Sequence, residues 1–589
     1  IYSLLHLTGY EDMTMDEIKN FRQWGAKTAG HPEYGHAKGI ETTTGPLGQG
    51  ISNAVGFAMA EQSLQSRYGK KIVNHYTYVI AGDGCLMEGV SQEAITLAGK
   101  QKLNKLIVMW DDNNISIDGE INISDVTDQQ KRFESAGWSV FSINGHDPDE
   151  IDMALTKAKK SSKPSMIACK TTIAVGVEGV ENTAGGHGYN IKDPQLEQMR
   201  KLYEWPYPKY EIPTDVKQSW LEIGSKGSEE RGKWEDRFLN LSKSKQLEFN
   251  RIINLETPKK LSAAIKRLKR EISEKKPKMA TRKSSQTALE VINPIMKETL
   301  GGSADLTGSN NTITKDMKWF DADNRDGRHV AYGIREHGMA AAMNGMALHG
   351  GVRPYGGTFM CFTDYARPSM RLAALMQIPV VYVYTHDSIG LGEDGPTHQP
   401  VEHLAISRAT PNTWVFRPAD TVETAEAWEI AVTTKSTPSV LSLTRQGLRT
   451  VRTKHTNKNM VGMGAYILSE AEAKRKVILI ASGSEVEIAI DAKVKLEAEG
   501  IGTRVVSMPC MELFAEQNES YRRRVLPAGP VRVGIEAAVR QGWDRWLTGE
   551  RGKHNKSAFI GMDSFGASAP AEELYVKFGI TSDGVIKAV

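Results

Sequence analysis

Two short apolar runs, each leading into a polar motif, constrain the fold of this chain more than any other feature. Residues 77–81 lead into Gly82-Asp83-Gly84, and residues 106–110 lead to Asn113-Asn114. Continuous apolar runs of this length are typical of parallel strands covered on both faces, so we expect both strands to be buried. Ligands of such sheets bind at the carboxyl ends of the strands, where glycines let the backbone approach phosphate oxygens. Since Asp and Asn supply the oxygen ligands that Mg²⁺ prefers, the pattern predicts a diphosphate held through a magnesium ion.

Length and composition indicate a multidomain protein of ordinary globular type. A chain of 589 residues is too long for one core, and about 150 residues per domain predicts three to four domains. Hydrophobic residues make up 40% and charged residues 25%, as in soluble globular proteins. The net charge of +3 is nearly balanced and predicts no nucleic-acid partner.

The sequence also predicts a cytoplasmic location without membrane contact. No apolar run approaches the roughly 18 residues of a membrane helix, and no signal peptide is visible. The four cysteines are far apart and form no CxxC pair. They fit a reducing compartment better than a disulfide framework or a zinc site.

The densest basic stretch, residues 259–278, has two readings. It resembles a nucleic-acid patch by charge, yet apolar residues recur within it at helical spacing: Leu261, Ile265, Leu268 and Ile272. This spacing favours an amphipathic linker helix with a solvated basic face.

Alternating strand-like and helix-like segments predict three consecutive α/β domains with mainly parallel sheets. We assign residues 1–245 to the first domain, 246–275 to a linker, 276–458 to the second and 459–589 to the third. The chain begins at Ile1 inside an apolar, helix-like segment, so we expect the first domain to lack its natural start. Further strands are predicted at 165–169, 380–384, 477–481, 503–507 and 531–535.

A polar loop directly follows the predicted strand at 380–384. Residues 386–400 contain His386, Asp394 and His398 among glycines and further carboxylates. A single histidine at such a place is more often structural, but two histidines flanking an aspartate at a strand end favour a polar substrate site.

Several further motifs carry a resemblance to a known family. They are His31-Pro32-Glu33, residues 45–50 (GPLGQG), Arg335-Glu336-His337-Gly338, residues 356–365 (GGTFMCFTDY) and residues 565–570 (FGASAP). In this order, and with the loop at 386–400, they resemble the transketolases across all three domains. The resemblance implies a thiamine diphosphate-binding fold, with a diphosphate-binding first domain and a pyrimidine-binding second domain.

The resemblance implies roles for the cofactor-binding residues. Asp83, Asn113 and the backbone carbonyl of Ile115 would ligate the metal, which is Mg²⁺ or else Ca²⁺ or Mn²⁺. Phe362 would stack on the pyrimidine, whereas Glu336 would hydrogen-bond its N1′ and so favour deprotonation of the thiazolium carbon. The full cofactor-binding set is Gly45, Pro46, Leu47, Gly84, Asn113, His187, Glu336 and Phe362.

The same resemblance implies how a sugar phosphate is bound. Asp394 would bind a substrate hydroxyl, His31 and His398 would contact oxygens near the transferred two-carbon unit, and His187 would contact diphosphate and substrate. The residues expected around the phosphate are Arg282, Ser309, His386 and Arg445. The catalytic set is Glu336, His187, His386, His398 and His31.

The chain departs from the family pattern at three places. Around His187, residues 186–190 read GHGYN where the family commonly has Ser-His-Gly-Ala-Pro. Residues 444–447 read TRQG in place of Ser-Arg-Gln-Asn. Two family motifs, each with a histidine beside glycine, would precede Ile1, so the chain as given is expected to be catalytically impaired.

The predicted activity is that of a transketolase of the pentose phosphate pathway. It transfers a two-carbon ketol unit from a ketose phosphate to an aldose phosphate, at two sites on a homodimer interface. The alternatives are a dihydroxyacetone synthase, a deoxyxylulose-phosphate synthase that releases CO₂ from pyruvate, and a non-catalytic cofactor-binding or scaffold protein.

Overall fold

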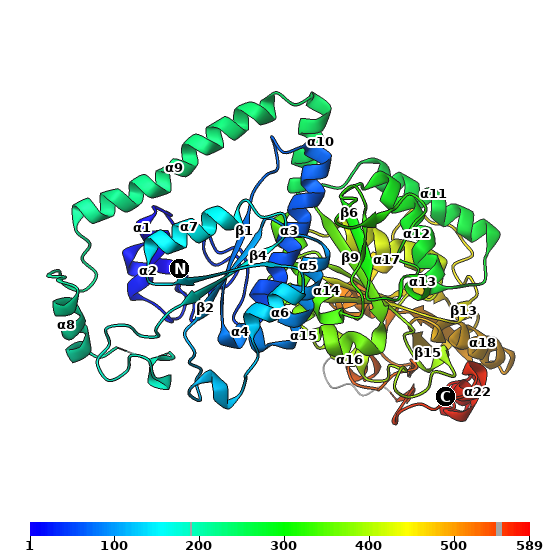
Figure 1. Cartoon of the computed structure of the whole chain (residues 1–589). Helices are drawn as coiled ribbons and strands as arrows, with labels where there is room; N and C mark the ends of the chain where they lie inside the picture. Colours follow the sequence, from blue (N-terminus) through cyan, green and yellow to red (C-terminus); the bar gives the residue numbers. More distant parts are fainter. Residues whose placement is uncertain (189–190, 549–555) are drawn as a thin grey trace. The chain divides into compact units, whose positions relative to one another are not determined.

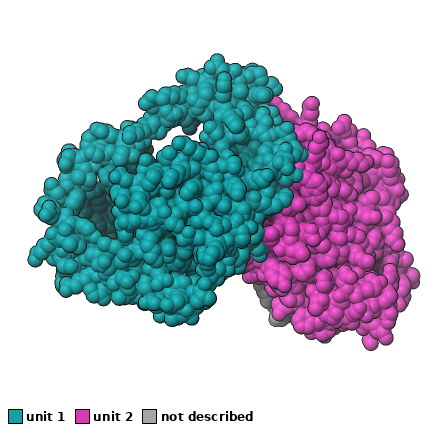
Figure 2. All heavy atoms as spheres, in the orientation of Figure 1, with its two compact units in different colours: residues 1–250, 321–326, 341–351 teal, residues 251–320, 327–340, 352–589 magenta. Residues whose placement is uncertain are grey.

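The computed structural model describes residues 1–188, 191–548 and 556–589, which form two compact units. The first unit comprises residues 1–250, 321–326 and 341–351, and the second comprises 251–320, 327–340 and 352–589 (Figure 2). Each unit combines helices with mainly parallel sheets (Figure 1), so the predicted α/β class is confirmed.

The first unit is built on a four-stranded parallel sheet. Its strand order is β1-β2-β4-β3, and all neighbouring pairs are parallel. The strands are β1 (Thr77–Gly82), β2 (Leu106–Asp112), β3 (Ser139–Asn144) and β4 (Ser165–Lys170). The predicted strands at 77–81, 106–110 and 165–169 are therefore confirmed. The helices up to residue 253 are α1 (Tyr2–Leu7), α2 (Met15–Lys19), α3 (Gln49–Tyr68), α4 (Asp83–Met87), α5 (Gly89–Lys100), α6 (Gln129–Ser135), α7 (Pro148–Ala158), α8 (Asp193–Leu202), α9 (Thr214–Leu239) and α10 (Lys243–Ile253).

The prediction that β1 is buried on both faces is wrong. Tyr78 is 45% and Ile80 is 77% exposed, while Ala81 is buried. β1 is an edge strand of its sheet, with β2 as its one neighbour. An apolar run predicts a strand, but it does not predict whether another element of the same chain covers both faces.

The second unit contains a seven-stranded sheet with the order β11-β12-β10-β9-β6-β8-β7, whose neighbouring strands are parallel. Its strands are β6 (Thr299–Ser303), β7 (Trp319–Phe320), β8 (His329–Ala331), β9 (Arg353–Phe359), β10 (Val381–Thr385), β11 (Trp414–Phe416) and β12 (Ser439–Leu443). The predicted strand at 380–384 corresponds to β10. The accompanying helices are α11 (Lys260–Lys275), α12 (Thr281–Ile295), α13 (Thr307–Asn310), α15 (Thr363–Leu375), α16 (His403–Arg408) and α17 (Thr421–Thr433). Helix α14 (Glu336–His349) begins in this unit, and its residues from 341 on belong to the first unit.

The basic stretch at 259–278 folds as the predicted amphipathic helix, α11. Its apolar face enters the core of the second unit, where α12 and α17 pack against it. The four residues predicted for this face, Leu261, Ile265, Leu268 and Ile272, are all buried. Because the apolar face is fully used in packing, the helical interpretation of this stretch is confirmed.

A five-stranded sheet near the C-terminus also belongs to the second unit. Its order is β14-β16-β15-β17-β18, and only β14 is antiparallel to its neighbour. The strands are β14 (Tyr466–Ser469), β15 (Arg475–Ala481), β16 (Gly502–Ser507), β17 (Val531–Ile535) and β18 (Ser557–Ile560). They include the three predicted strands of this region. The helices are α18 (Glu485–Ala498), α19 (Met511–Glu516), α20 (Glu519–Val525), α21 (Asp544–Leu547), α22 (Ala571–Lys577) and α23 (Ser582–Ala588).

No helix within the described ranges is both long and apolar enough to cross a membrane. All four cysteines are free.

Candidate active site

Asp83 and Asn113 meet at one edge of the first unit's sheet. Gly82, the last residue of β1, pairs with Asp111 in β2, so Asp83 at the start of α4 and Asn113 just beyond β2 leave neighbouring strands. The Asp83 side chain is buried, and its Oδ1 accepts a hydrogen bond from Trp110 Nε1 at 3.0 Å. Its Oδ2 is buried without a hydrogen-bond partner among the described residues.

The surroundings of Asp83 favour a cation. The pKa of this carboxyl is raised to about 6, mainly by burial, with the nearby charges of Asp112 and Asp111 contributing to the rise. A buried carboxylate oxygen without a partner is costly unless a positive charge or a hydrogen bond compensates it. The donor set therefore fits a divalent metal ion bound between Asp83 and a diphosphate.

Asn113 is oriented by its neighbours in the loop after β2. Its Nδ2 donates to Asp111 Oδ2 at 3.2 Å, while its Oδ1 accepts from the backbone N–H of Ile115 at 3.0 Å. Asp111 is itself held by a hydrogen bond from the Thr171 hydroxyl. The structure thus places Asp83, at the start of α4, at the same end of the sheet as Asn113 and Ile115, which lie on a loop fixed by hydrogen bonds.

The segment at 45–48 contacts the start of α4. A Cβ atom added to Gly84 would lie 3.0 Å from Leu47 Cδ1, and one added to Gly45 would lie 3.3 Å from His31 Cβ. Leu47 is 50% exposed. Two of the predicted cofactor glycines are therefore in close contact with two other predicted residues, and larger side chains would disturb these contacts.

The remaining predicted residue of the first unit, His187, is exposed in the turn after the 3-10 helix Ala184–Gly186. Among the described residues, no hydrogen bond or ring contact joins His187 to Asp83 or Asn113. Tyr189 and Asn190, which complete its motif, lie outside the described residues.

In the second unit, His386 directly follows β10 and is buried in a left-handed conformation with φ of 62°. Its ring stacks on Phe359, with 3.7 Å between the centroids, and its Nδ1 lies 2.8 Å from the Thr385 hydroxyl. Burial, reinforced by the charges of Arg282 and Arg445, lowers the pKa of His386 to about 3. His386 is therefore neutral at physiological pH and held rigidly at the strand end.

The aromatic stack extends to two further predicted residues. Phe362 lies parallel to Phe359 with 6.0 Å between the ring centroids, and His398 meets Phe362 edge-on at 5.7 Å. Thr397 Oγ1 lies 2.9 Å from His398 Nδ1. Phe362, His386 and His398 therefore share one aromatic cluster, formed by segments that are distant in sequence.

Arg282 and Arg445 are brought together by a short two-stranded sheet. β5 (Met279–Ala280) precedes Arg282 and pairs with β13 (Gly447–Leu448), which follows Arg445. Burial and the charge of Arg445 both lower the pKa of Arg282. Two guanidinium groups near each other repel unless an anion lies between them, so this arrangement suits a phosphate dianion.

Backbone carbonyls orient both guanidinium groups. Arg282 Nη1 donates to the carbonyl oxygen of Ser309 at 2.7 Å, and Arg445 Nη1 donates to that of Leu391 at 2.9 Å. The first bond also brings Ser309 beside Arg282, as predicted for the phosphate set. Arg282 Nε is buried and has no hydrogen-bond partner among the described residues, so it keeps donor capacity for an anion.

Glu336 is the first residue of α14 and is only 8% exposed. Burial raises the pKa of its carboxyl, which brings the proton-bound form closer to neutral pH. Such a carboxyl can share a proton with a ring nitrogen, which is the predicted role. Asp394 is exposed in the loop at 386–400, and the structure leaves its side chain accessible.

Sequence reasoning missed two residues that contact the loop at 386–400. Phe359 stacks on the His386 ring. In the sequence, nothing distinguishes Phe359 from an ordinary core aromatic residue. Gln399 is buried, and its Nε2 donates to the carbonyl oxygens of Gly392 at 2.8 Å and Ala567 at 2.9 Å. Its place next to His398 is the one sequence signal that points to it.

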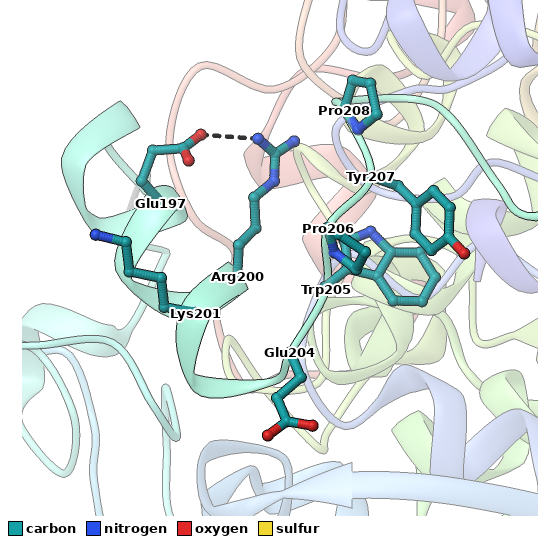
Figure 3. Close-up of a pocket in the computed structure, with 8 residues that line it drawn as sticks. All are labelled: Glu197, Arg200, Lys201, Glu204, Trp205, Pro206, Tyr207 and Pro208. Carbon is teal, nitrogen blue, oxygen red and sulfur yellow. Dashed lines mark hydrogen bonds and ion pairs between the residues drawn. The ribbon is translucent and has the colours of Figure 1, made fainter.

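A surface hollow of about 520 Å³ lies apart from these residues, beside α8 and residues 204–208 (Figure 3). Trp205 and Tyr207 line it with their rings 5.1 Å apart, and Arg200 forms an ion pair with Glu197 at 2.7 Å. No predicted site residue lines this hollow.

Comparison with known proteins identifies the family. The model of the transketolase thiamine diphosphate-binding domain matches residues 1–258, that of the transketolase pyrimidine-binding domain matches 277–451, and that of the transketolase-like C-terminal domain matches 464–581. The chain belongs to the transketolase family. The predicted resemblance and the thiamine diphosphate-binding fold are thereby confirmed.

Related transketolases cover the whole chain. The transketolase of Rhodobacter capsulatus is 61% identical over 589 residues, covering 100% of this chain and 88% of the relative. That of Sinorhizobium medicae is 54% identical, covering 100% and 83%. Among solved structures, transketolase from Leishmania mexicana has a TM-score of 0.93 at 41% identity, covering 100% of this chain and 86% of that one. A Pichia stipitis transketolase in complex with sedoheptulose 7-phosphate has a TM-score of 0.93 at 38% identity, with the same coverage.

Proposed function

We propose that this chain transfers a two-carbon ketol unit from a ketose phosphate such as xylulose 5-phosphate to an aldose phosphate such as ribose 5-phosphate or erythrose 4-phosphate, as in the pentose phosphate pathway. The observation that carries the proposal is the pair Arg282 and Arg445 beside the neutral His386 at the end of β10. This group suits a dianionic phosphate in a transketolase, whereas an unphosphorylated donor would not need it.

The residues of the chain divide the chemistry between them. Thiamine diphosphate supplies, when bound, the nucleophilic carbon and the electron sink for cleaving the bond beside a ketose carbonyl. Glu336 shares a proton with the pyrimidine, and Phe362 offers an aromatic face to that ring. His31, His187 and His398 hold the oxygens around the transferred unit, and Asp394 binds a hydroxyl group farther along the sugar.

The metal ion is proposed to be Mg²⁺, with Ca²⁺ or Mn²⁺ as substitutes, ligated by Asp83, Asn113 and the carbonyl of Ile115. Support comes from the buried, unpartnered Oδ2 of Asp83 and from the all-oxygen donor set. Gly45, Pro46, Leu47 and Gly84 would line the cofactor beside this ion. The domain limits 1–245, 276–458 and 459–589 and a cytoplasmic location, which the four free cysteines support, belong to the same proposal.

A coupled assay with xylulose 5-phosphate and ribose 5-phosphate tests the activity directly. We expect product formation that depends on thiamine diphosphate and a divalent ion, in a chain whose N-terminus is extended to match its relatives. CO₂ release from pyruvate would indicate a synthase instead. Cofactor binding without turnover of any donor would indicate a non-catalytic protein.

We further propose a homodimer in which the cofactor contacts the first unit of one chain and the second unit of its partner. The motifs divide this way, because Asp83 and Asn113 belong to the first unit, whereas Glu336 and Phe362 belong to the second. Isologous dimers are also the commonest oligomers.

Mixing two inactive variants tests the shared site. An Asp83→Ala chain combined with a Glu336→Gln chain forms heterodimers with one intact and one doubly damaged site. A statistical mixture should restore up to about a quarter of wild-type activity, since about half of the dimers are mixed and each carries one site. Activity that stays at the level of the separate variants, although the subunits exchange, would mean that each chain builds its own site.

A further inference from the structure

A second cluster of ligating side chains lies in the second unit, outside the residues that the proposed reaction uses. Asp364 is in the first turn of α15, Glu402 directly precedes α16, and His403 is the first residue of α16. One candidate ligand atom from each of the three lies within 4.8 Å of the others. This is the single such group within the part of the chain that the structure describes.

The state of His403 points to a ligand. It is 5% exposed, and neither of its ring nitrogens has a hydrogen-bond partner among the described residues. Its Nε2 lies 3.3 Å from Asp364 Oδ2, and its Nδ1 lies 3.7 Å from Glu402 Oε2. A buried imidazole that makes no hydrogen bond is costly, and two carboxylates at its side repel each other. A cation bound to Nε2 beside Asp364 would give the ring a partner, and it would reduce the repulsion if Glu402 turned toward it from the Nδ1 side.

The separation between His403 and Asp364 matches a tetrahedral metal site. Zinc bonds to nitrogen and carboxylate oxygen of about 2.0–2.2 Å place two ligand atoms of a tetrahedron about 3.3–3.5 Å apart. The distance of 3.3 Å between His403 Nε2 and Asp364 Oδ2 falls within this range. Because the Glu402 side chain is 39% exposed, it can turn to provide the third ligand.

We propose that Asp364, Glu402 and His403 bind one divalent transition-metal ion, with Zn²⁺ as the best match. Zinc binds both imidazole nitrogen and carboxylate oxygen, so one imidazole and two carboxylates, with water in the fourth position, form a compatible donor set. Mg²⁺ prefers oxygen ligands alone, so this site differs in selectivity from the one at Asp83.

The ion would link the starts of α15 and α16, two segments that lie close in sequence to site residues. Phe362 lies two residues before Asp364, and His398 lies four residues before Glu402. Joining the start of α15 to the start of α16 would therefore restrain both the aromatic cluster and the substrate loop. Since the ion binds the folded chain, it should also raise the thermal stability of the protein.

The competing arrangement is a protonated His403 flanked by the two carboxylates as a plain ion pair. Such a pair needs no metal and binds none with a defined stoichiometry. Metal binding and its dependence on His403 therefore distinguish the two.

Calorimetric titration with Zn²⁺ tests the site on the full chain after treatment with a chelator. Millimolar Mg²⁺ and thiamine diphosphate are present throughout, so that the Asp83 site is occupied. We expect one Zn²⁺ per chain and at least a 10-fold weaker affinity in His403→Gln and Asp364→Asn, since even indirect partners of a metal are worth roughly 10- to 100-fold. His36→Gln, at an exposed histidine of the first unit, is the matched control and should leave the affinity unchanged.

Thermal unfolding gives a second readout. Saturating Zn²⁺ should raise the melting temperature of the unaltered chain and of His36→Gln, but not that of His403→Gln. If His403→Gln does not fold, the test uses Asp364→Asn instead. The Asp364 side chain is exposed and asparagine has the same shape, so this variant should fold. The absence of a stoichiometric Zn²⁺, or equal affinity in the unaltered chain and the folded variant, would overturn the proposal. Neither result bears on the ketol transfer, which is measured separately.

Discussion

The strand ends of the two units hold their site residues in different ways. At the end of β1, Asp83 has one buried oxygen without a partner among the described residues, and Leu47 beside it is half exposed. At the end of β10, His386 is buried, stacked on Phe359 and hydrogen-bonded to Thr385. The first arrangement leaves a carboxylate oxygen that suits a cation, whereas the second is preorganised by contacts within the protein. Binding energy is thus expected mainly from the first, and substrate orientation mainly from the second.

The largest effect is expected from Glu336→Gln, which tests whether the second unit carries the proton chemistry. The amide cannot share a proton with the pyrimidine, so kcat should fall by about 10²- to 10⁴-fold. Cofactor affinity in calorimetry should stay close to that of the unaltered chain. Glu499→Gln, at an exposed helix end, is the control. Near-normal turnover in Glu336→Gln would remove this residue from the mechanism.

Asp83→Ala tests the dependence of the first unit on its metal ion. Losing this ligand leaves the diphosphate charge poorly compensated, so cofactor affinity at ordinary Mg²⁺ concentrations should fall by about 100-fold or more. Asp118→Ala, an exposed aspartate near Asn113, should change little. Unchanged cofactor affinity in Asp83→Ala, measured by calorimetry, would contradict the assignment of the metal site.

Arg445→Leu separates binding of the phosphate from binding of the sugar. A charge-assisted hydrogen bond is worth about 1.5–3 kcal/mol, so kcat/KM for xylulose 5-phosphate should fall about 10- to 150-fold. The loss should be far smaller with hydroxypyruvate, which has no phosphate. Equal losses with both donors would show that Arg445, which is hydrogen-bonded to Leu391, acts through the loop alone.

The last effect concerns His386 and the pH dependence of stability, and it leaves activity at neutral pH aside. Its pKa in the folded chain is about 3, below the ordinary value of 6.5. Between these two pH values His386 is therefore protonated in the unfolded chain and neutral in the folded chain. This residue therefore destabilises the fold as the pH falls from about 6.5 to 3, by up to about 1.4 kcal/mol per pH unit.

His386→Asn should flatten that dependence, because Asn tolerates the left-handed backbone and does not titrate. Denaturant midpoints at pH 7, 6 and 5 measure it. Parallel curves for both proteins would show that the pKa of His386 does not differ between the folded and the unfolded chain, which contradicts the lowered pKa.

The sequence predicts those parts of the fold and site that depend on local pattern. The apolar runs gave β1, β2, β4 and β10, and the spacing of Leu261 to Ile272 gave α11. The meeting of Asp83 and Asn113 also follows from the pattern, because adjacent parallel strands end at one edge. For the strands and the helix the information lies within a few residues along the chain, and the meeting of Asp83 and Asn113 needs in addition only that the two strands be neighbours.

Contacts between distant segments could not be predicted in this way. The exposed face of β1, the stacking of Phe359 on His386 and the cluster of Asp364 with His403 depend on which elements become neighbours after folding. No periodicity or spacing of a single segment records that. The assigned roles of the site residues and the domain limits stay predictions until the variants are measured.

The hydrogen bonds of Gln399 join the C-terminal part of the chain to the loop at 386–400. This amide ties the loop that carries Asp394 and His398 to Ala567, and the Ser568 hydroxyl donates to the carbonyl oxygen of Glu393. A Cβ at Gly566 would overlap the Gln399 amide at 1.8 Å. Substitutions at 565–568 are therefore expected to move the loop that carries Asp394 and His398 from a distance, without altering either of those two residues.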